Sequence, residues 1–591
     1  MKTVLQWFVY LSRGSHGLLS AAILMMVAIP LLSWFQFKWS QRFFNQITAD
    51  LRDQLALLVG LLIGLFAIKA LESALTRFNG YVQESLLLNL NRRIEAYQFE
   101  LIQPSDITRM ETPSYQQDLN LLNNNLTKLG QLLHSCLTVV KEIGIIVVYA
   151  YLIIAQSWLV LAAVVAFSFP NLLYVWRHAS RLDLFFERIS QAQMESSRVT
   201  SFLIMPMAIK EMLVFAAKPF FLAKWETASD KVIGQRRLFM KSEYFWGLLV
   251  DLFLPIKYAV TQLILISLLY RGEMGLGDYL AVTASLTPLD NAIRSLIVST
   301  DTFINLRLFR EKWSHFHNRY LSHSKADHSH RIDTIRNIRA EQLTFRYPER
   351  DSPALHHVSL RLNGSGSLAI VGANGSGKST LAKILSGLHR VEENRLFYND
   401  VPIERIDRET LLRRISIVSQ DFVKYPLSVY ENISLNKNNG VDPKYENIKT
   451  RYTELIPSNL IQYPDTVLGN EYLNSIQLSG GQWQRIAIAR GLYKDCDMLL
   501  LDEATSELDP VAEMELIAKI LTDRKDKMTV IVTHNLRLAM LTDTVIVMED
   551  GRIAEQGPPT RLAEYSSLFK RMQDKQIPSE VPNGHGFQNV I

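Results

Sequence analysis

The chain has 591 residues, 48% of them hydrophobic, and a formal net charge of +5 at pH 7. This length favours two or more domains over a single core, and so high an apolar content favours a membrane protein that carries a large soluble part. The small net charge gives no indication of nucleic-acid binding. The two widely separated cysteines, Cys136 and Cys496, exclude a disulfide framework and a paired-cysteine metal site.

The first 300 residues contain six apolar stretches of membrane-spanning length. We therefore predict a polytopic α-helical membrane domain with six transmembrane helices. The first stretch follows Lys2 and Arg13, as in a signal peptide, but no small-residue cleavage site comes after it, so we interpret it as a retained helix. The six stretches are 17–34, 55–75, 137–155, 158–176, 244–270 and 277–300.

The connections between these stretches alternate in length. Those after the first, third and fifth are short, whereas those after the second and fourth are each roughly sixty residues long and have a helical pattern. Basic residues gather between 177 and 243, while the turn at 156–157 carries no charge. By the positive-inside rule, both long loops and both termini lie in the cytoplasm.

The character of the chain changes after residue 305. Histidines at irregular spacing, without a cysteine partner, indicate a solvated linker rather than the alternative, a metal site. They are His315, His317, His323, His328 and His330.

Beyond residue 340, short β-type runs alternate with helical patterns, which predicts an α/β domain with a largely parallel sheet. The predicted strands are 366–372, 415–419, 498–502, 529–533 and 544–549. We expect a membrane domain at 1–320, a linker at 321–339, the α/β domain at 340–575 and a disordered tail at 576–591.

A glycine-rich turn follows the apolar strand 368–371 and precedes a helical run from Thr380. Its glycines let successive backbone N–H groups point at phosphate oxygens, and the helix adds its positive N-terminal end. Lys378 is predicted to bind the β- and γ-phosphates of a nucleotide, and the Ser379 hydroxyl to coordinate Mg²⁺. The turn reads Gly372-Ala373-Asn374-Gly375-Ser376-Gly377-Lys378-Ser379, the phosphate-binding loop pattern.

Two carboxylates, Asp502 and Glu503, end another apolar strand in the Walker B arrangement. Asp502 is placed to hold Mg²⁺, directly or through water. Glu503 lies one residue further and can polarise the attacking water as a general base. The alternative, that both are solvated turn acids, is disfavoured by the phosphate loop in the same domain.

Leu478-Ser479-Gly480-Gly481-Gln482 opens the helical run 483–490. A serine and two glycines at a helix N-terminus form a second anion-binding nest. Lying between a phosphate loop and a Walker B strand, this segment resembles the signature of ATP-binding cassette (ABC) proteins, and the resemblance covers the second half of the chain. It implies an ABC ATPase of the α/β P-loop NTPase class, with ATP and Mg²⁺ as its ligands.

The resemblance implies further roles. Gln420 resembles the Q-loop glutamine, His534 the switch histidine that contacts the γ-phosphate, and Tyr347 the aromatic residue that stacks on adenine. The segment 506–509 resembles the D-loop, although Glu507 stands where the family more often has alanine. The implied Mg²⁺ ligands are Ser379, Gln420 and Asp502, and the implied catalytic residues are Glu503, His534 and Gln420. The implied ATP-binding residues are Tyr347, Gly372, Asn374, Gly375, Ser376, Gly377, Lys378, Ser379, Thr380, Ser479, Gly480, Gly481 and Gln482.

The whole chain resembles the exporter type of this family, because long loops follow the second and fourth helices and the ATPase follows directly. The resemblance implies a homodimer in which two ATPase domains sandwich two ATP molecules, each between the phosphate loop of one copy and the signature of the other. We expect an integral protein among the lipids of a bacterial inner (plasma) membrane, with the ATPase in the cytoplasm. Candidate coupling segments, which would press on the ATPase, are 112–119 and 207–214.

Short matches suggest the substrate. Gln482-Trp483-Gln484-Arg485, 468–472 and 210–215 resemble the branch that exports lantibiotics and other modified peptides. We expect ATP-driven export of an amphipathic or modified peptide, with a lipid or multidrug exporter as the alternative and a membrane-anchored regulatory ATPase as a further one.

Ionisable residues inside the apolar stretches leave two interpretations open: they line a polar path for substrate, or they pair with one another. Asp290 and Arg294 are four residues apart, which suits mutual pairing on a helix. The set is Lys141, Glu142, Asp251, Lys257, Asp290 and Arg294.

Overall fold

The computed structural model describes residues 15–47, 55–101, 107–321, 330–348, 350–437, 442–565 and 567–576. They belong to two compact units, one made of Met1–Gln103 and Leu119–Phe316, the other of Pro104–Asp118 and His317–Ile591. Lys2, Arg13, His323, His328 and all but the first residue of the predicted disordered tail lie outside the described residues.

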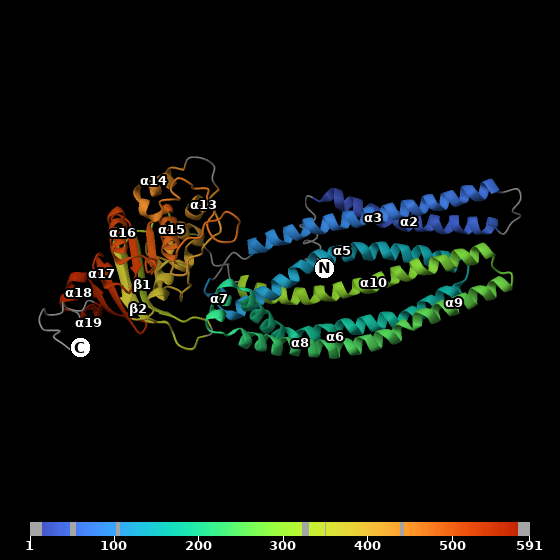
Figure 1. Ribbon diagram of the computed structural model, residues 1–591, viewed down its shortest axis with the longest axis horizontal. Helices are drawn as coiled ribbons and strands as arrows, with labels where there is room; N and C mark the ends of the chain where they lie inside the picture. Colours follow the sequence, from blue (N-terminus) through green and yellow to red (C-terminus); the bar gives the residue numbers. More distant parts are fainter. Residues whose placement is uncertain are drawn as a thin grey trace, which may run out of the picture. The chain divides into compact units, whose positions relative to one another are not determined.

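The first unit consists of long helices (Figure 1). Runs of Leu, Ile and Val form helices here because a helix satisfies its backbone hydrogen bonds within itself, as a lipid environment requires. Helix α2 packs against α3 and α10, and α6 packs against α8, α9 and α10. The bounds are α2 (His16–Ile47), α3 (Leu55–Leu101), α5 (Pro113–Ile154), α6 (Trp158–Ile204), α7 (Pro206–Val214), α8 (Lys218–Asp251), α9 (Phe253–Tyr270) and α10 (Leu276–Phe316).

Several of these helices are long and apolar enough to cross a membrane. Four qualify among the described residues, at His16–Ile47, Leu55–Ala96, His134–Ile154 and Lys218–Tyr270, and a shorter apolar helix spans Trp158–Tyr174. The predicted sixth stretch lies in α10, which is more polar because it carries Asp278, Asp290 and Arg294. The unit is thus a helical membrane domain, and the count of six spans stays a prediction.

The two long loops are largely extensions of the membrane helices, as their sequence pattern predicts. Helix α3 continues to Leu101 and α5 begins at Pro113, with the short α4 (Ile107–Met110) between them. Helix α6 continues to Ile204, and α8 begins at Lys218 after the short α7. Prolines at helix starts, Pro113, Pro206 and Pro219, suit the first turn, where the missing N–H costs no helical hydrogen bond.

The second unit contains two sheets. The six-stranded sheet has the order β10-β9-β3-β8-β7-β6, in which all neighbours are parallel except β9 and β10, so the predicted largely parallel sheet is confirmed. Its strands are β3 (Gly366–Gly372), β6 (Ile415–Val418), β7 (Met498–Asp502), β8 (Met528–Val532), β9 (Thr544–Glu549) and β10 (Arg552–Gly557).

A four-stranded antiparallel sheet, with the order β2-β1-β4-β5, was not predicted from the sequence. Burial alternates along β2, which is the pattern of a strand with one covered face. The strands are β1 (Asn337–Phe345), β2 (Leu355–Asn363), β4 (Leu396–Tyr398) and β5 (Val401–Pro402).

Both faces of the central strand β3 are covered. Leu368 and Ile370 pack on one side with Leu381 of α11 (Lys378–Leu385), while Ala369 and Val371 pack on the other with residues of α17 (Leu536–Ala539) and α19 (Ser567–Gln576). This double burial explains the continuous apolar runs of β3, β7 and β8. The remaining helices are α12 (Arg408–Arg413), α13 (Val429–Ser434), α14 (Pro443–Arg451), α15 (Gly480–Tyr493), α16 (Pro510–Asp523) and α18 (Pro559–Tyr565).

Candidate functional site

The phosphate loop, the Walker B carboxylates, Gln420 and His534 follow strands that end at one edge of the six-stranded sheet. Strands β3, β8, β7 and β6 are parallel neighbours, so their carboxyl ends meet along that edge. Ligand sites of open α/β sheets form outside these carboxyl ends. Gly372 ends β3 and Asp502 ends β7, while His534 and Gln420 each follow two residues after β8 and β6.

The phosphate loop is held in a shape that requires glycine. Gly377 has φ +98°, and a Cβ there would lie 2.9 Å from the Ala354 carbonyl oxygen. The ammonium of Lys378 donates to the carbonyl oxygens of Gly372, at 3.1 Å, and Ala373, at 2.8 Å. These bonds hold Lys378 across the mouth of the loop.

The loop also offers open hydrogen-bonding capacity. The Ser376 hydroxyl is buried and has no hydrogen-bond partner among the described residues. A buried polar atom without a partner costs stability, so a ligand that supplies one is favoured there. The buried hydroxyl, the glycine turn and Lys378 together fit a bound phosphate chain. Burial lowers the pKa of Lys378, and the nearby charges of Glu503 and Asp502 counter part of that effect.

The side-chain oxygens of Ser379 and Asp502 lie close together. The Ser379 hydroxyl donates to Asp502 Oδ1 at 3.1 Å, and the Asp502 side chain is buried. Burial raises the pKa of Asp502, and Ser379 and two lysines oppose that rise. Hydroxyl and carboxylate oxygens are the donors that Mg²⁺ prefers, so this pair fits the predicted metal. The third predicted ligand, Gln420, lies exposed in the turn after β6.

Glu503 and His534 form a second pair at the same edge. His534 Nε2 lies 2.6 Å from Glu503 Oε1. Glu503 has φ +50°, a left-handed conformation that costs a non-glycine residue on the order of 1–2 kcal/mol, and its N–H donates to Val532 O at 3.0 Å. The strained backbone and the histidine contact set the direction of the carboxylate that is predicted to act as the base.

Tyr347 lies in a cluster of rings that the sequence did not predict. The Tyr347 hydroxyl is 3.1 Å from Thr380 Oγ1 at the start of α11, and its ring meets the His389 ring edge-on at 5.6 Å. His389 is fully buried and stacks on Phe345 with the rings 3° from parallel. His389 was not predicted from the sequence, because a single histidine after a helix carries no pattern that distinguishes it from a solvent-exposed one.

A segment of the first long loop belongs to the same unit as this cluster. Thr108 Oγ1 lies 3.2 Å from His389 Nδ1, and Glu111 accepts from Lys383 of α11 at 3.0 Å. Burial alone would lower the pKa of Lys383, but the hydrogen bond and charge of Glu111 raise it above the ordinary value. These contacts lie just before the candidate coupling segment 112–119. Residues 207–214, the second candidate, lie in α7.

The signature segment forms the N-terminus of α15. The Ser479 hydroxyl accepts from the Gln482 N–H and the Gln482 side chain accepts from the Ser479 N–H, which is a capping box. The predicted D-loop lies directly against it, because a Cβ on Gly481 would be 2.8 Å from the Glu507 carbonyl oxygen. Among the described residues, no hydrogen bond or ion pair joins this segment to the phosphate loop of the same chain.

Some ionisable residues of the membrane unit pair with one another, whereas another lines a cavity, so both interpretations of these residues apply. Lys257 pairs with Asp290 through Nζ and Oδ1 at 2.5 Å, so Asp290 takes its partner from α9 rather than from Arg294. Lys141 pairs with Glu142 at 2.8 Å. Asp251 forms no hydrogen bond or ion pair in the described part of the chain, and it lines a cavity between α6 and α8.

Comparisons with known proteins agree with this site. Residues 355–506 match the family model described as ABC transporter. The chain is 28% identical over 62% of its length to the subtilin transport ATP-binding protein SpaT of Bacillus subtilis, of which it spans 61%. It is 24% identical over 90% of its length to the nisin transport ATP-binding protein NisT of Lactococcus lactis subsp. lactis, of which it spans 88%.

The fold is similar to a solved structure described as a bacterial Atm1-family ABC exporter with ATP bound. The TM-score is 0.75 at 20% identity, over 95% of this chain and 99% of the other. At this identity the likeness concerns the fold. The predicted resemblance to ABC half-transporters of the exporter type is confirmed.

We expect Glu503→Gln to keep ATP binding and to lower ATP hydrolysis by roughly 10²-fold or more, the scale of losing a general base. Glutamine keeps the size of the side chain but lacks a basic oxygen. Hydrolysis and direct nucleotide binding would be measured on the purified protein, with the exposed Glu549→Gln as the matched control. Hydrolysis near the wild-type rate would remove Glu503 from this role.

Proposed function

Because this chain is an ATP-binding cassette half-transporter of the exporter type, we propose that a homodimer of it exports an amphipathic or modified peptide, driven by ATP hydrolysis. The observation that carries the proposal is that one chain holds one phosphate loop and one signature segment, with no bond between them among the described residues. Two copies are then needed to enclose a nucleotide.

Within each composite site, the residues of one copy bind and position ATP. Tyr347 stacks on adenine, and Lys378 with the N–H groups of 372–380 holds the phosphates. Ser479, Gly480, Gly481 and Gln482 of the other copy close the site from the signature side. Ser379, Asp502 and Gln420 would hold Mg²⁺, which when bound neutralises charge on the phosphates.

Glu503 acts as the general base in this proposal. Its carboxylate accepts a proton from the attacking water, and His534, 2.6 Å away, orients that carboxylate. His534 also lies after the strand that neighbours β3, so its ring can reach the terminal phosphate held by the loop. Gln420, exposed beyond β6, completes the set.

The first long loop offers a path by which the ATPase state reaches the membrane helices. Thr108 contacts the buried His389, whose ring touches the proposed adenine platform Tyr347. Since Pro104–Asp118 groups with the ATPase unit, we propose that this segment together with the start of α5 acts as a coupling segment.

The remaining predictions complete the proposal. Six helices span a bacterial inner membrane and contact its lipids, with both termini and the ATPase in the cytoplasm. The membrane domain occupies 1–320, the linker 321–339 and the ATPase 340–575. Similarity to NisT over 90% of the chain favours a peptide as substrate over a lipid or drug.

Inverted membrane vesicles test the function directly. We expect ATP-dependent uptake of a dye-labelled amphipathic peptide into vesicles that contain the wild-type protein, and none with Glu503→Gln. Uptake of a labelled phospholipid or drug in place of the peptide would support the alternative exporter, and ATP hydrolysis with no vectorial uptake of any of them would support the regulatory ATPase.

Co-expression of two defective chains tests the homodimer. Lys378→Ala disables the phosphate loop and Ser479→Arg the signature, so the mixed dimer has one intact site and one site with both lesions. We expect each variant alone to be inactive and the tagged, purified mixed dimer to recover part of the ATP hydrolysis. Full hydrolysis by a strictly monomeric form would contradict the proposal.

Thr108→Val tests the coupling segment. Valine keeps the shape of threonine but removes the bond to the buried His389, so we expect ATP hydrolysis without peptide to persist while peptide uptake per ATP falls several-fold. Thr138→Val is the matched control, because this half-buried threonine of α5 donates to the carbonyl oxygen of His134 in its own helix. An unchanged ratio of uptake to hydrolysis in the Thr108 variant would show that this contact does not couple.

A further inference from the structure

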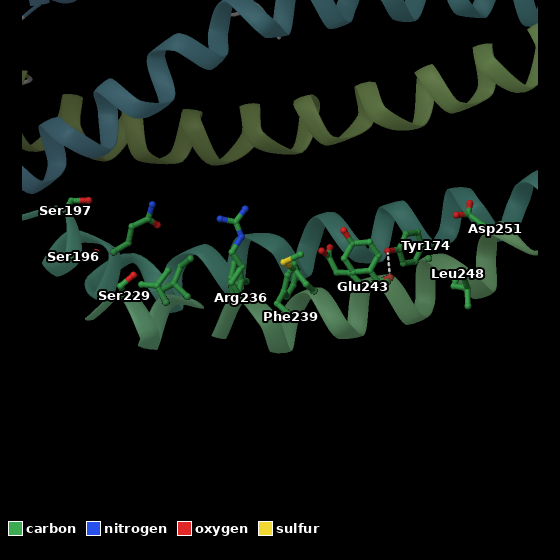
Figure 2. Close-up of a pocket in the computed structure, with 16 residues that line it drawn as sticks. Tyr174, Ser196, Ser197, Ser229, Arg236, Phe239, Glu243, Leu248 and Asp251 are labelled. Atoms are coloured by element: carbon green, nitrogen blue, oxygen red, sulfur yellow. Dashed lines mark hydrogen bonds between the residues drawn. The ribbon is translucent and has the colours of Figure 1, made fainter. Parts of the chain in front are cut away.

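A groove of about 780 Å³ lies between α6 and α8 of the membrane unit, and Figure 2 shows the side chains that line it. On its α8 wall, further lining residues of the same helix flank a stripe with steps of three, four or seven residues: Ser229, Arg236, Met240, Glu243, Gly247 and Asp251. Such steps place side chains on one face of a helix. From Ser229 to Asp251 the stripe runs about 33 Å along the axis, which matches roughly ten residues of extended peptide.

The middle of the groove is lined by apolar side chains, and two contacts there join α6 to α8. Phe185 of α6 stacks on Phe239 of α8 with ring centroids 4.4 Å apart. The Tyr174 hydroxyl donates to the Glu243 carbonyl oxygen at 3.1 Å and ties the two helices together (Figure 2). Met240 beside these rings adds a flexible apolar surface that adapts to different ligand side chains.

The charges are spread along the groove. Arg236 lies nearer the N-terminal end of α8. The carboxylates of Glu243 and Asp251 lie nearer its C-terminal end, about 12 Å apart along the helix. A lipid carries its charge in one headgroup, whereas a peptide carries charges along its length. The carboxylates outnumber the guanidinium, so this lining favours a ligand with basic groups.

The polar path continues beyond the groove. Asp251 also lines a smaller cavity of about 20 Å³, together with Lys257, Asp290 and Arg294. Asp290 is 7% exposed, and its Oδ2 has no hydrogen-bond partner among the described residues while Oδ1 holds Lys257. An open acceptor, buried in a membrane unit beside Asp251, adds a further position at which a ligand's N–H group is favoured.

We propose that this groove is a binding site for an elongated, cationic amphipathic peptide. The peptide's basic groups face Glu243 and Asp251, its apolar side chains pack on Phe185 and Phe239, and Asp290 Oδ2 accepts from it at the inner end. The inference rests on the proposed peptide export and names the site and the charge of the peptide.

Binding to the full-length protein in lipid nanodiscs, without ATP, tests the site. The probes are two dye-labelled peptides of about twelve residues with identical apolar positions, one carrying lysine and the other glutamate at the polar positions. We expect the lysine peptide to bind about 10-fold more tightly, and its affinity to fall with added salt. Glu243→Gln and Asp251→Asn should each weaken it about 5-fold, and Arg236→Gln should strengthen it.

Glu226→Gln, an exposed carboxylate of α8 outside the groove, should bind like the wild type. Glu243→Asp keeps the charge and should recover most of the loss seen in Glu243→Gln. If Asp251→Asn fails to assemble, Glu243→Gln and Glu243→Asp decide the outcome.

Equal binding of both peptides, or wild-type binding by Glu243→Gln and Asp251→Asn, overturns the groove proposal even when vesicles still take up the lysine peptide. Displacement of the bound peptide by a phospholipid also overturns it. Absence of uptake of any peptide, with ATP hydrolysis intact, instead overturns the proposed export.

Discussion

The parallel pairing of β3, β8 and β7 is the constraint on which the chemistry of the ATPase unit depends. Ile370 of β3 and Asp502 of β7 both align with Val532 of β8. This register brings the phosphate loop, the two carboxylates and His534 to the same height at one edge. A slip of one residue would turn each strand's side chains to the opposite face and separate Ser379 from Asp502.

The strands can hold this register because they are buried on both faces. Leu381 and Ile384 of α11 cover one face of β3, and Leu536 and Phe569 cover the other. Sliding one strand past its neighbour would displace packed apolar side chains on both faces at once, so the close packing favours a single register. The rigid sheet then supports two features that cost free energy: the positive φ of Glu503, and the buried hydroxyl of Ser376, which has no hydrogen-bond partner in the part of the chain that the structure describes.

The charged side chains of the membrane unit lie in two kinds of surroundings. Lys257 and Asp290 neutralise each other inside the helix bundle, as Lys141 and Glu142 do, which reduces the cost of placing charge among apolar side chains. Asp251 is instead left facing a groove. The same unit therefore contains charges that are paired within the helix bundle and carboxylates that line a groove.

The sequence by itself determined the features that are local along the chain: the phosphate loop, the Walker B strand, the signature at a helix start, the strand positions of the parallel sheet and most of the long apolar helices. Each depends on a short run of residues, in which glycine placement, apolar periodicity or a capping serine specifies the backbone. The roles of Gln420 and Tyr347 are different in kind: they are implied by a family resemblance in the order of the motifs, and they stay predictions.

Only the tertiary structure decided which side chains meet across long separations. It paired Asp290 with Lys257 rather than Arg294, placed Thr108 on His389, added the antiparallel sheet β2-β1-β4-β5, and lined one groove with Tyr174 and Glu243. These contacts join residues tens to hundreds of positions apart. Which residues meet depends on how helices rotate and strands align when the whole core packs. The residue pattern within a short segment does not contain this information.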